Sequence, residues 1–179
     1  MKVQVSAMRC VVGLALAARV ASGQVAPSSQ VILSGGVTAL TSESRELRKP
    51  GGHLQVGLAR LTHSRFVSRV QIDAGYHSLA SVAAPDLVPP NSSVWMVTAS
   101  IVKDAPTIYG FHPYVIAGIG SVYMDYNTGG EVHLDLAGGG GVRFPTIGRA
   151  QPFIEGRYHR IGTVPPNRLI PVSFGVAFH

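Results

Sequence analysis

The sequence predicts an all-β protein: an eight-stranded antiparallel up-and-down transmembrane β-barrel preceded by a cleaved signal peptide. Three observations predict this fold. From about residue 30 onward, apolar side chains recur at every second position, the period of a β-strand, and helical periodicity is hard to find. Eight such segments run for roughly 10 to 14 residues, longer than the usual strand of about 5–6 residues and long enough for a tilted membrane strand. Charged residues make up only 13% of the 179-residue chain, fewer than a water-facing sheet would carry.

The N-terminus has the pattern of a secretory signal peptide. Two basic residues precede an uncharged, mostly apolar run over 10–18, and Ala21–Ser22–Gly23 supplies small residues before a cut. The run is too short for a spanning helix, which needs about 20 apolar residues. We therefore expect residues 1–23 to be the signal peptide and 24–179 the barrel domain. The alternative is an amphipathic N-terminal helix of a cytosolic protein.

The predicted strands are separated by turn-forming sequences rich in Pro, Gly and Asn. They cover residues 30–41, 53–62, 65–78, 92–102, 112–124, 131–144, 151–160 and 169–178. Short links are expected at 63–64 and 145–150, with an intermediate one at 103–111. Longer or polar links are expected at 42–52, 79–91, 125–130 and 161–168. Short turns at one end and longer loops at the other, with an even strand number, are typical of bacterial outer-membrane barrels.

Alternation by itself does not say which face meets water. A membrane barrel turns its apolar face to lipid and its polar face inward, and a soluble barrel or sandwich does the reverse. The polar faces here carry both charge signs among small residues, which suits the narrow lumen of eight strands. We therefore expect outward Val70, Ile72, Leu134, Leu136, Phe174 and Val176. Aromatic residues near segment ends resemble interfacial girdles: Tyr76, Trp95, Tyr109, Phe111, Tyr114, Tyr123, Tyr126, Phe144, Phe153, Tyr158 and Phe178.

Four stretches carry a family resemblance, which is specific mainly from 111 to 178. They are Pro113–Gly120, Gly138–Phe144, Gln151–His159 and Ile170–Phe178. They resemble the fifth to eighth strands of the small outer-membrane β-barrel proteins related to the OmpA transmembrane domain and the opacity proteins. The resemblance implies an outer-membrane location and recognition of the C-terminal strand by the barrel-assembly machinery. That signal ends in a terminal aromatic residue in the family, whereas His179 follows Phe178 here.

Several kinds of chemistry are disfavoured. The net charge of +6 includes three basic residues of the signal, and the remaining cations are scattered, so no nucleic-acid surface is predicted. The Gly138–Gly141 run lacks the Lys–Ser/Thr of a phosphate-binding loop. The pattern typical of barrel enzymes that deacylate lipid A is a His, a Ser two residues later, and a Glu. In this sequence Ile161, and not Ser, stands two residues after His159. We predict no catalytic residue and no cofactor.

The inward faces predict a charge network in the lumen. Its members are Arg69, Asp73, Asp135, Arg143, Glu155 and Arg157. A turn over 145–150 should bring Arg143 near Phe153 or Glu155, and Asp135 near His159 or beyond it. His133 with Asp135, and Glu155 with His159, could also be metal-ligand pairs, but three acids and three bases favour ion pairs and no metal.

A second set of cations lies in or near the predicted loops: Arg45, Arg48, Lys49, Arg160 and Arg168. They either face lipopolysaccharide phosphates or are ordinary solvated charges. The predicted function is a structural or surface-interaction role in the outer membrane of a Gram-negative envelope, without catalysis. Outer-membrane lipid is the expected surrounding. The alternatives are a soluble secreted or periplasmic barrel that binds a small apolar ligand, and a lipid A-modifying barrel enzyme.

Overall fold

A computed structural model describes residues 29–42, 49–62, 64–80, 91–126, 129–163 and 166–179. The expected signal peptide and its cleavage site lie outside the described residues. Across the described ranges, no helix is long and apolar enough to cross a membrane.

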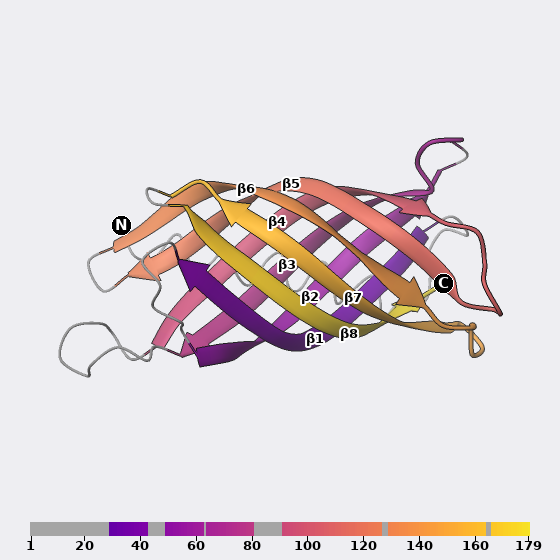
Figure 1. Cartoon of the computed structure of the whole chain (residues 1–179), viewed down its shortest axis with the longest axis horizontal. Coiled ribbons are helices and arrows are strands. Elements are labelled where there is room, and N and C mark those ends of the chain that lie inside the picture. Colours follow the sequence, from indigo (N-terminus) through magenta and orange to yellow (C-terminus); the bar gives the residue numbers. More distant parts are fainter. Residues whose placement is uncertain (1–28, 43–48, 63, 81–90, 127–128, 164–165) are drawn as a thin grey trace.

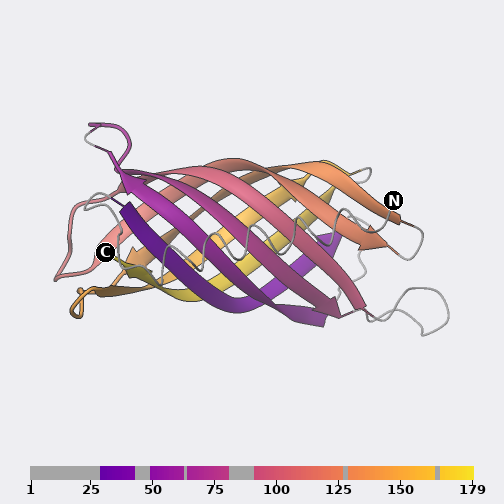
Figure 2. The same cartoon turned by 180° about the vertical axis from the view of Figure 1, so that it is seen from behind.

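The chain forms the predicted closed antiparallel barrel of eight strands, seen from two sides in Figures 1 and 2. Each strand pairs with the next in sequence, and β8 closes the barrel by pairing with β1. The strands are β1 (Ser29–Ser42), β2 (Lys49–Leu61), β3 (Arg69–Ala80), β4 (Asn91–Asp104), β5 (His112–Tyr126), β6 (Gly129–Arg143), β7 (Ala150–Ile161) and β8 (Asn167–Phe178).

The register makes the barrel narrow and its strands strongly tilted. Following Cα partners once around the barrel from Val31 leads back to β1 at Thr41, ten residues further along. A shear of this size over eight strands corresponds to a tilt of about 40°, and the diagonal strands are visible in Figure 1. A barrel with so few strands has room inside for side chains alone.

The two ends of the barrel have links of different kinds. At the terminal end, links 62–68, 105–111 and 144–149 lie beside the first residue of β1 and the last of β8. At the loop end, the links are 43–48, 81–90, 127–128 and 162–166. The predicted contrast in length is wrong, because β3 begins at Arg69 rather than 65 and leaves seven residues in the first terminal-end link. Phe66 therefore lies in that link and is 80% exposed.

A tight hairpin turn closes the link between β4 and β5. Ile108 and Phe111 form a β-bridge around Tyr109 and Gly110, whose φ angles are 50° and 83°. Two successive positive φ angles are those of a type I′ turn, whose twist matches that of the flanking strands. The link 105–111 therefore contains a well-defined hairpin turn at Tyr109 and Gly110, although the link itself is seven residues long.

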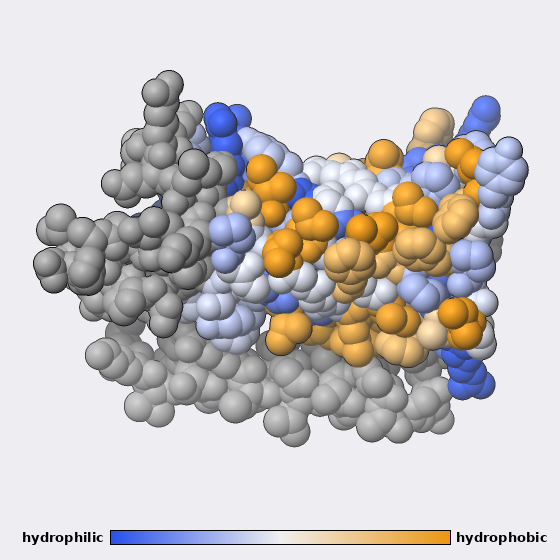
Figure 3. Space-filling model, turned by 60° about the horizontal axis from the view of Figure 1, so that its bottom comes forward, coloured by the Kyte–Doolittle hydropathy of each residue, from blue (hydrophilic) through white to orange (hydrophobic). Residues whose placement is uncertain are grey.

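The predicted sidedness of the strands is confirmed. Outward Ile72, Leu134 and Phe174 are 56%, 60% and 65% exposed, whereas inward Asp73 and Asp135 are 2% and 0% exposed. Figure 3 shows hydrophobic residues gathered on the wall, with hydrophilic ones at both of its ends. Outward charges among the described strand side chains are confined to Arg60 and Lys103 near the terminal end and to Arg160 and Arg168 near the loop end.

Aromatic side chains border the apolar wall at both ends. Tyr76, Trp95 and Tyr123 are successive Cα partners across β3, β4 and β5 near the loop end, and the first two rings lie 4.8 Å apart. At the terminal end, the rings of Phe111 and Phe144 meet edge to face at 5.7 Å. These pairs lie where aromatic girdles occur in membrane barrels.

Two aromatic residues expected in these girdles point into the lumen instead. Tyr114 and Phe153 are 6% and 7% exposed. Each lies an even number of positions from a buried, inward residue of its own strand. Phe153 lies two residues before Glu155, and Tyr114 lies two residues before Ile116. Proximity to a strand end therefore does not by itself place an aromatic side chain on the outer wall. The side chain of Tyr126 lies outside the described residues.

Candidate functional site in the lumen

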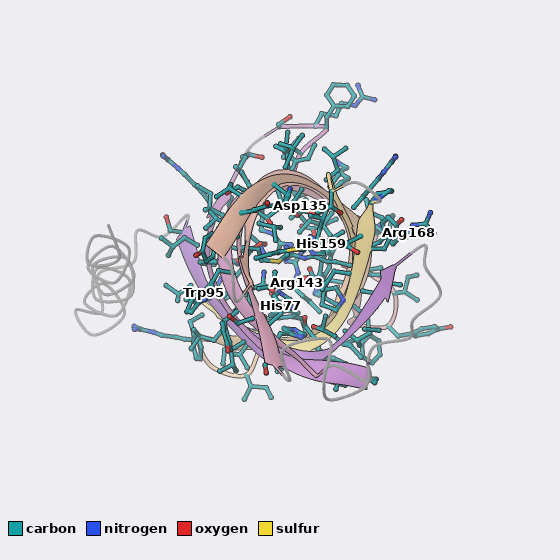
Figure 4. All side chains as sticks on the ribbon, turned by 90° about the vertical axis from the view of Figure 1, so that its left-hand side faces the viewer. His77, Trp95, Asp135, Arg143, His159 and Arg168 are labelled. Carbon is teal, nitrogen blue, oxygen red and sulfur yellow. The ribbon has the colours of Figure 1, made fainter. Side chains whose placement is uncertain are left out.

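The lumen is filled by side chains from all eight strands, and Figure 4 looks along it from the loop end. His77, Asp135, Arg143 and His159 lie inside the ring of strands, whereas Trp95 and Arg168 lie outside. The strand registers place the inward side chains in four successive groups, which are described below. From the terminal end to the loop end we call them the terminal cluster, the central cluster, the histidine layer and the apolar collar.

The central cluster consists of Gln71, Asp73, Tyr114, Glu155 and Arg157, all at most 6% exposed. Arg157 on β7 reaches across the barrel to β3, where its Nη1 lies 2.8 Å from an Asp73 oxygen, and its Nε lies 2.6 Å from Glu155. Gln71 donates to both Asp73 oxygens at 2.8 and 3.0 Å, and the Tyr114 hydroxyl donates to Glu155 at 2.8 Å. One guanidinium thus bridges two carboxylates, and neutral donors supply further hydrogen bonds to both, as buried ion pairs require.

The terminal cluster consists of Arg69, Asp104 and Arg143, arranged around the ring of Tyr114. Asp104 accepts a hydrogen bond from Arg143 and lies 3.7 Å from Arg69. The guanidinium carbons of Arg69 and Arg143 lie 5.5 and 4.8 Å from the centroid of the Tyr114 ring, within the range of cation–π attraction. Tyr114 therefore joins the two clusters, its ring against the arginines and its hydroxyl on Glu155.

The histidine layer lies above the central cluster and is built mainly from neutral hydrogen-bonding groups. The Thr38 hydroxyl lies 2.8 Å from His53 Nδ1 and 3.0 Å from His77 Nδ1, so one side chain bridges two rings. His53 Nε2 lies 2.8 Å from the Ser173 hydroxyl. The rings of His53 and His77 stack with centroids 5.1 Å apart. These contacts join β1, β2, β3 and β8 across the lumen.

Asp135 belongs to this layer rather than to the arginine clusters. Its Oδ2 lies 2.7 Å from His159 Nδ1, and the two side chains are 0% and 2% exposed. The structure thus brings Asp135 to His159, and it pairs Arg143 with Phe153 across β6 and β7, as expected from the turn between them. The six residues expected in one network are divided between two arginine clusters and a separate Asp–His pair.

The apolar collar lines the lumen toward the loop end. Its inward side chains are 0–6% exposed and come from four strands: Val94, Met96, Val122, Met124, Ile161 and Leu169. The sequence reasoning missed this collar, because it assigned apolar residues to the outer face. In Val94–Trp95–Met96–Val97 both faces are apolar, so alternation carries no signal there.

Sequence reasoning also missed Asp104 and His53. The predicted strand 92–102 stopped two residues before Asp104, and His53 opened a segment with weak alternation. In the structure β4 runs through Asp104, which keeps the inward parity of buried Thr98 and Ser100. Extending the predicted strand 92–102 by one residue pair would have found Asp104.

The expected outer cations are only partly described. Arg45 and Arg48 lie outside the described residues, as does the side chain of Lys49. Arg160 and Arg168 are exposed, and they are direct Cα partners on β7 and β8. Of the five residues, the structure brings these two together.

The residue pairs weighed as metal ligands have other partners. His133 Nε2 lies 3.2 Å from Glu131, and Asp135 binds His159. Glu155 is held by Arg157 and Tyr114. Within the described ranges, no group of three or more His, Cys, Asp or Glu side chains is arranged to hold a metal ion.

Comparisons with known proteins identify the fold. No protein-family model and no curated protein matches the sequence. Among solved structures, Neisserial surface protein A superposes with a TM-score of 0.64 at 16% identity, over 84% of this chain and 96% of that one. The outer membrane enzyme PagL gives 0.55 at 15% identity, over 83% and 99%. Ail of Yersinia pestis, in complex with the heparin analogue sucrose octasulfate, gives 0.50 at 13% identity, over 84% and 97%.

Proposed function

We propose that this chain, which has the fold of the small outer-membrane β-barrels, resides in the outer membrane as a sealed, non-catalytic barrel. Its role would be structural or one of surface interaction. The observation that carries the proposal is the distribution of charge: ion pairs occupy the terminal half of the lumen, and the outer wall is apolar.

The outer wall argues for lipid as the surrounding solvent. Val97, Ile119 and Val172 lie on three different strands and are 50%, 53% and 39% exposed. A soluble protein rarely leaves so continuous an apolar surface in water. The soluble alternative, a barrel that binds an apolar ligand, would need the opposite arrangement, with an apolar interior and a charged exterior.

The loop end would face the outside of the cell. An even number of strands brings both chain ends to the same end of the barrel, and a chain delivered by a signal peptide enters from the periplasm. The exposed Phe178 at the end of β8 supports recognition by the barrel-assembly machinery, as the family resemblance implies.

The packing of the lumen supports a barrel that does not conduct. Buried guanidinium–carboxylate pairs occupy its centre, and the apolar collar lies between them and the loop end. A hydrophobic constriction excludes water and ions, and wide channels occur in barrels of about 16 strands. The likeness to PagL extends to the fold, and the His–x–Ser pattern expected of a lipid A deacylase does not occur at His159.

The test is expression of the whole chain, with its first 23 residues, in a Gram-negative host. We expect the protein to be trimmed and to sediment with outer membranes, from which detergent releases it folded. Recovery of most of the folded protein in the soluble periplasm would overturn the proposal. A matched chain without residues 1–23 should stay in the cytoplasm, which controls for non-specific sedimentation.

A further inference from the structure

The link between β2 and β3 leaves the terminal end of the barrel sideways. In Figures 1 and 2 it is the purple segment that rises away from the barrel, and in Figure 4 it extends beyond the ring of strands. We call its described residues, 62 and 64–68, the lateral arm. Because the barrel axis would cross the membrane, a segment that leaves the wall sideways at this end lies along the membrane surface.

Hydrogen bonds hold the lateral arm in this position. The Thr62 amide donates to the Ser68 carbonyl at 2.9 Å, which closes the arm at its base, and the Ser68 amide donates to the Val102 carbonyl of β4 at 2.8 Å. The ammonium group of Lys103, also on β4, donates to the Arg65 carbonyl. The direction of the arm is therefore set by its contacts with β4.

The tip of the lateral arm combines an aromatic ring with a cation. Phe66 is 80% exposed, and Arg65 before it is exposed as well. An aromatic ring gains nothing from exposure to water, but at the edge of a bilayer it enters the apolar region while a neighbouring guanidinium remains at the headgroups. The tip therefore has the composition of a membrane-surface contact.

The charges around the arm favour an anionic partner. The three terminal-end links contain Arg65 and Arg149 but no Asp or Glu. Arg60 and Lys103 add outward cations at the ends of β2 and β4. The carboxylate of Asp104, also at the end of β4, is already engaged by the arginines of the terminal cluster. The exposed charged side chains of the described terminal end are therefore all positive.

We propose that the lateral arm binds the headgroup layer of the leaflet at the terminal end. Arg65 contacts the phosphate of an anionic phospholipid, and Phe66 inserts among the upper acyl carbons of the same layer. The guanidinium group suits this contact because its N–H donors bind two phosphate oxygens at once. The sideways direction of the arm favours lipid over an acidic periplasmic protein, because such a protein would approach the end of the barrel from the water. This proposal rests on the outer-membrane location proposed above, with the terminal end in the periplasm.

The first experiment measures the lipid selectivity of the full mature chain folded in detergent. Native mass spectrometry is the readout, and phosphatidylglycerol and phosphatidylcholine are the competing lipids. The parent should retain phosphatidylglycerol preferentially, and Arg65→Gln should reduce this preference about fivefold, the effect expected of one cation beside an anionic lipid. The matched control is Arg149→Gln, which removes an exposed arginine from another link at the same end and should keep the preference of the parent.

The second experiment measures where the tip lies. The sole cysteine, Cys10, falls within residues 1–23, so Phe66→Cys creates a single labelling site in the mature chain. In vesicles of the two lipids, a fluorophore attached there should be quenched by phospholipids that carry a nitroxide near the headgroup. The same fluorophore should be protected from iodide in the water.

Other results contradict the role of the arm. A preference that is unchanged in Arg65→Gln, or reduced equally in Arg149→Gln, would mean that the tip holds no phosphate. Quenching by iodide alone would place the tip in water, where a protein could reach it. Fractionation of the same variants separates the two proposals. A barrel found in the outer membrane whose arm selects no anionic lipid contradicts this inference alone, whereas recovery of the folded parent in the soluble periplasm contradicts the location.

Discussion

The two halves of the lumen fill the same narrow space with different chemistry. Toward the terminal end, three arginines and three carboxylates form direct ion pairs around Tyr114. Toward the loop end, histidines are held mainly by hydroxyl groups, and apolar side chains cover them. Removal of a charge from a buried pair leaves its partner without compensation, whereas removal of a neutral hydrogen bond costs less. The stability of the barrel should therefore depend most on its ion-paired half.

The largest effect is expected at Arg157. Replacement by Ala leaves Asp73 and Glu155, which are 2% and 5% exposed, without their shared cation. The free energy of unfolding should fall by about 3–5 kcal/mol, measured by urea titration of the barrel folded in lipid vesicles. The control is Arg60→Ala on the outer surface, which should change it by less than about 1 kcal/mol. Equal unfolding midpoints for the two variants would mean that water compensates the central carboxylates.

A smaller effect is expected in the histidine layer, at Thr38. Thr38→Val removes the hydroxyl shared by His53 and His77, and the free energy of unfolding should fall by about 1–3 kcal/mol. Thr98 provides a matched control, because it is 1% exposed and its hydroxyl has no partner among the described residues. Thr98→Val should be neutral or stabilising in the same urea titration. A Thr38 variant as stable as the Thr98 variant would contradict the bridging role.

The smallest effect is expected on conductance when the collar is opened. Leu169→Ser introduces a polar group into the apolar collar, but the central and terminal clusters still fill the lumen below it. Planar bilayer recordings should therefore show no steady channel for the parent or for this variant. Sustained ion current through Leu169→Ser, absent from the outward control Ile170→Ser, would identify the collar as the main seal and the ion-paired half as permeable.

Where one face of a strand is polar and the other apolar, the sequence was sufficient to predict the orientation. Arg69, Asp73 and their neighbours on β3 alternate with Val70 and Ile72, and the structure turns them inward and outward as expected. The same pattern predicted Arg143 near Phe153 or Glu155 across the turn from β6 to β7, and the structure makes Phe153 its Cα partner. In both cases the period of two decides which face each side chain takes, and a short connection limits which residues can lie opposite one another.

Where both faces are alike, the sequence carried no such information. Val94 and Met96 line the collar although they read as part of an apolar run, and Tyr114 turns inward from a strand end that suggested a girdle. The pairing of distant charges was equally inaccessible. Arg157 meets Asp73 across 84 positions of sequence and across the diameter of the barrel. Alternation along a strand tells which face a side chain takes, but it does not identify a partner on a distant strand.

By itself, the sequence determined the strand number, the closed antiparallel fold and which face of the strands points outward, because these follow from local periodicity and from turn residues. The tertiary structure alone decided which charges are partners, how they separate into clusters, and where apolar side chains line the lumen. Those features depend on the shear of the barrel, which is the shift along the strands accumulated around the closed sheet. Here Cα partners followed once around the barrel from Val31 return to β1 at Thr41. Shear is a property of the closed sheet, and it sets which inward side chains share a layer.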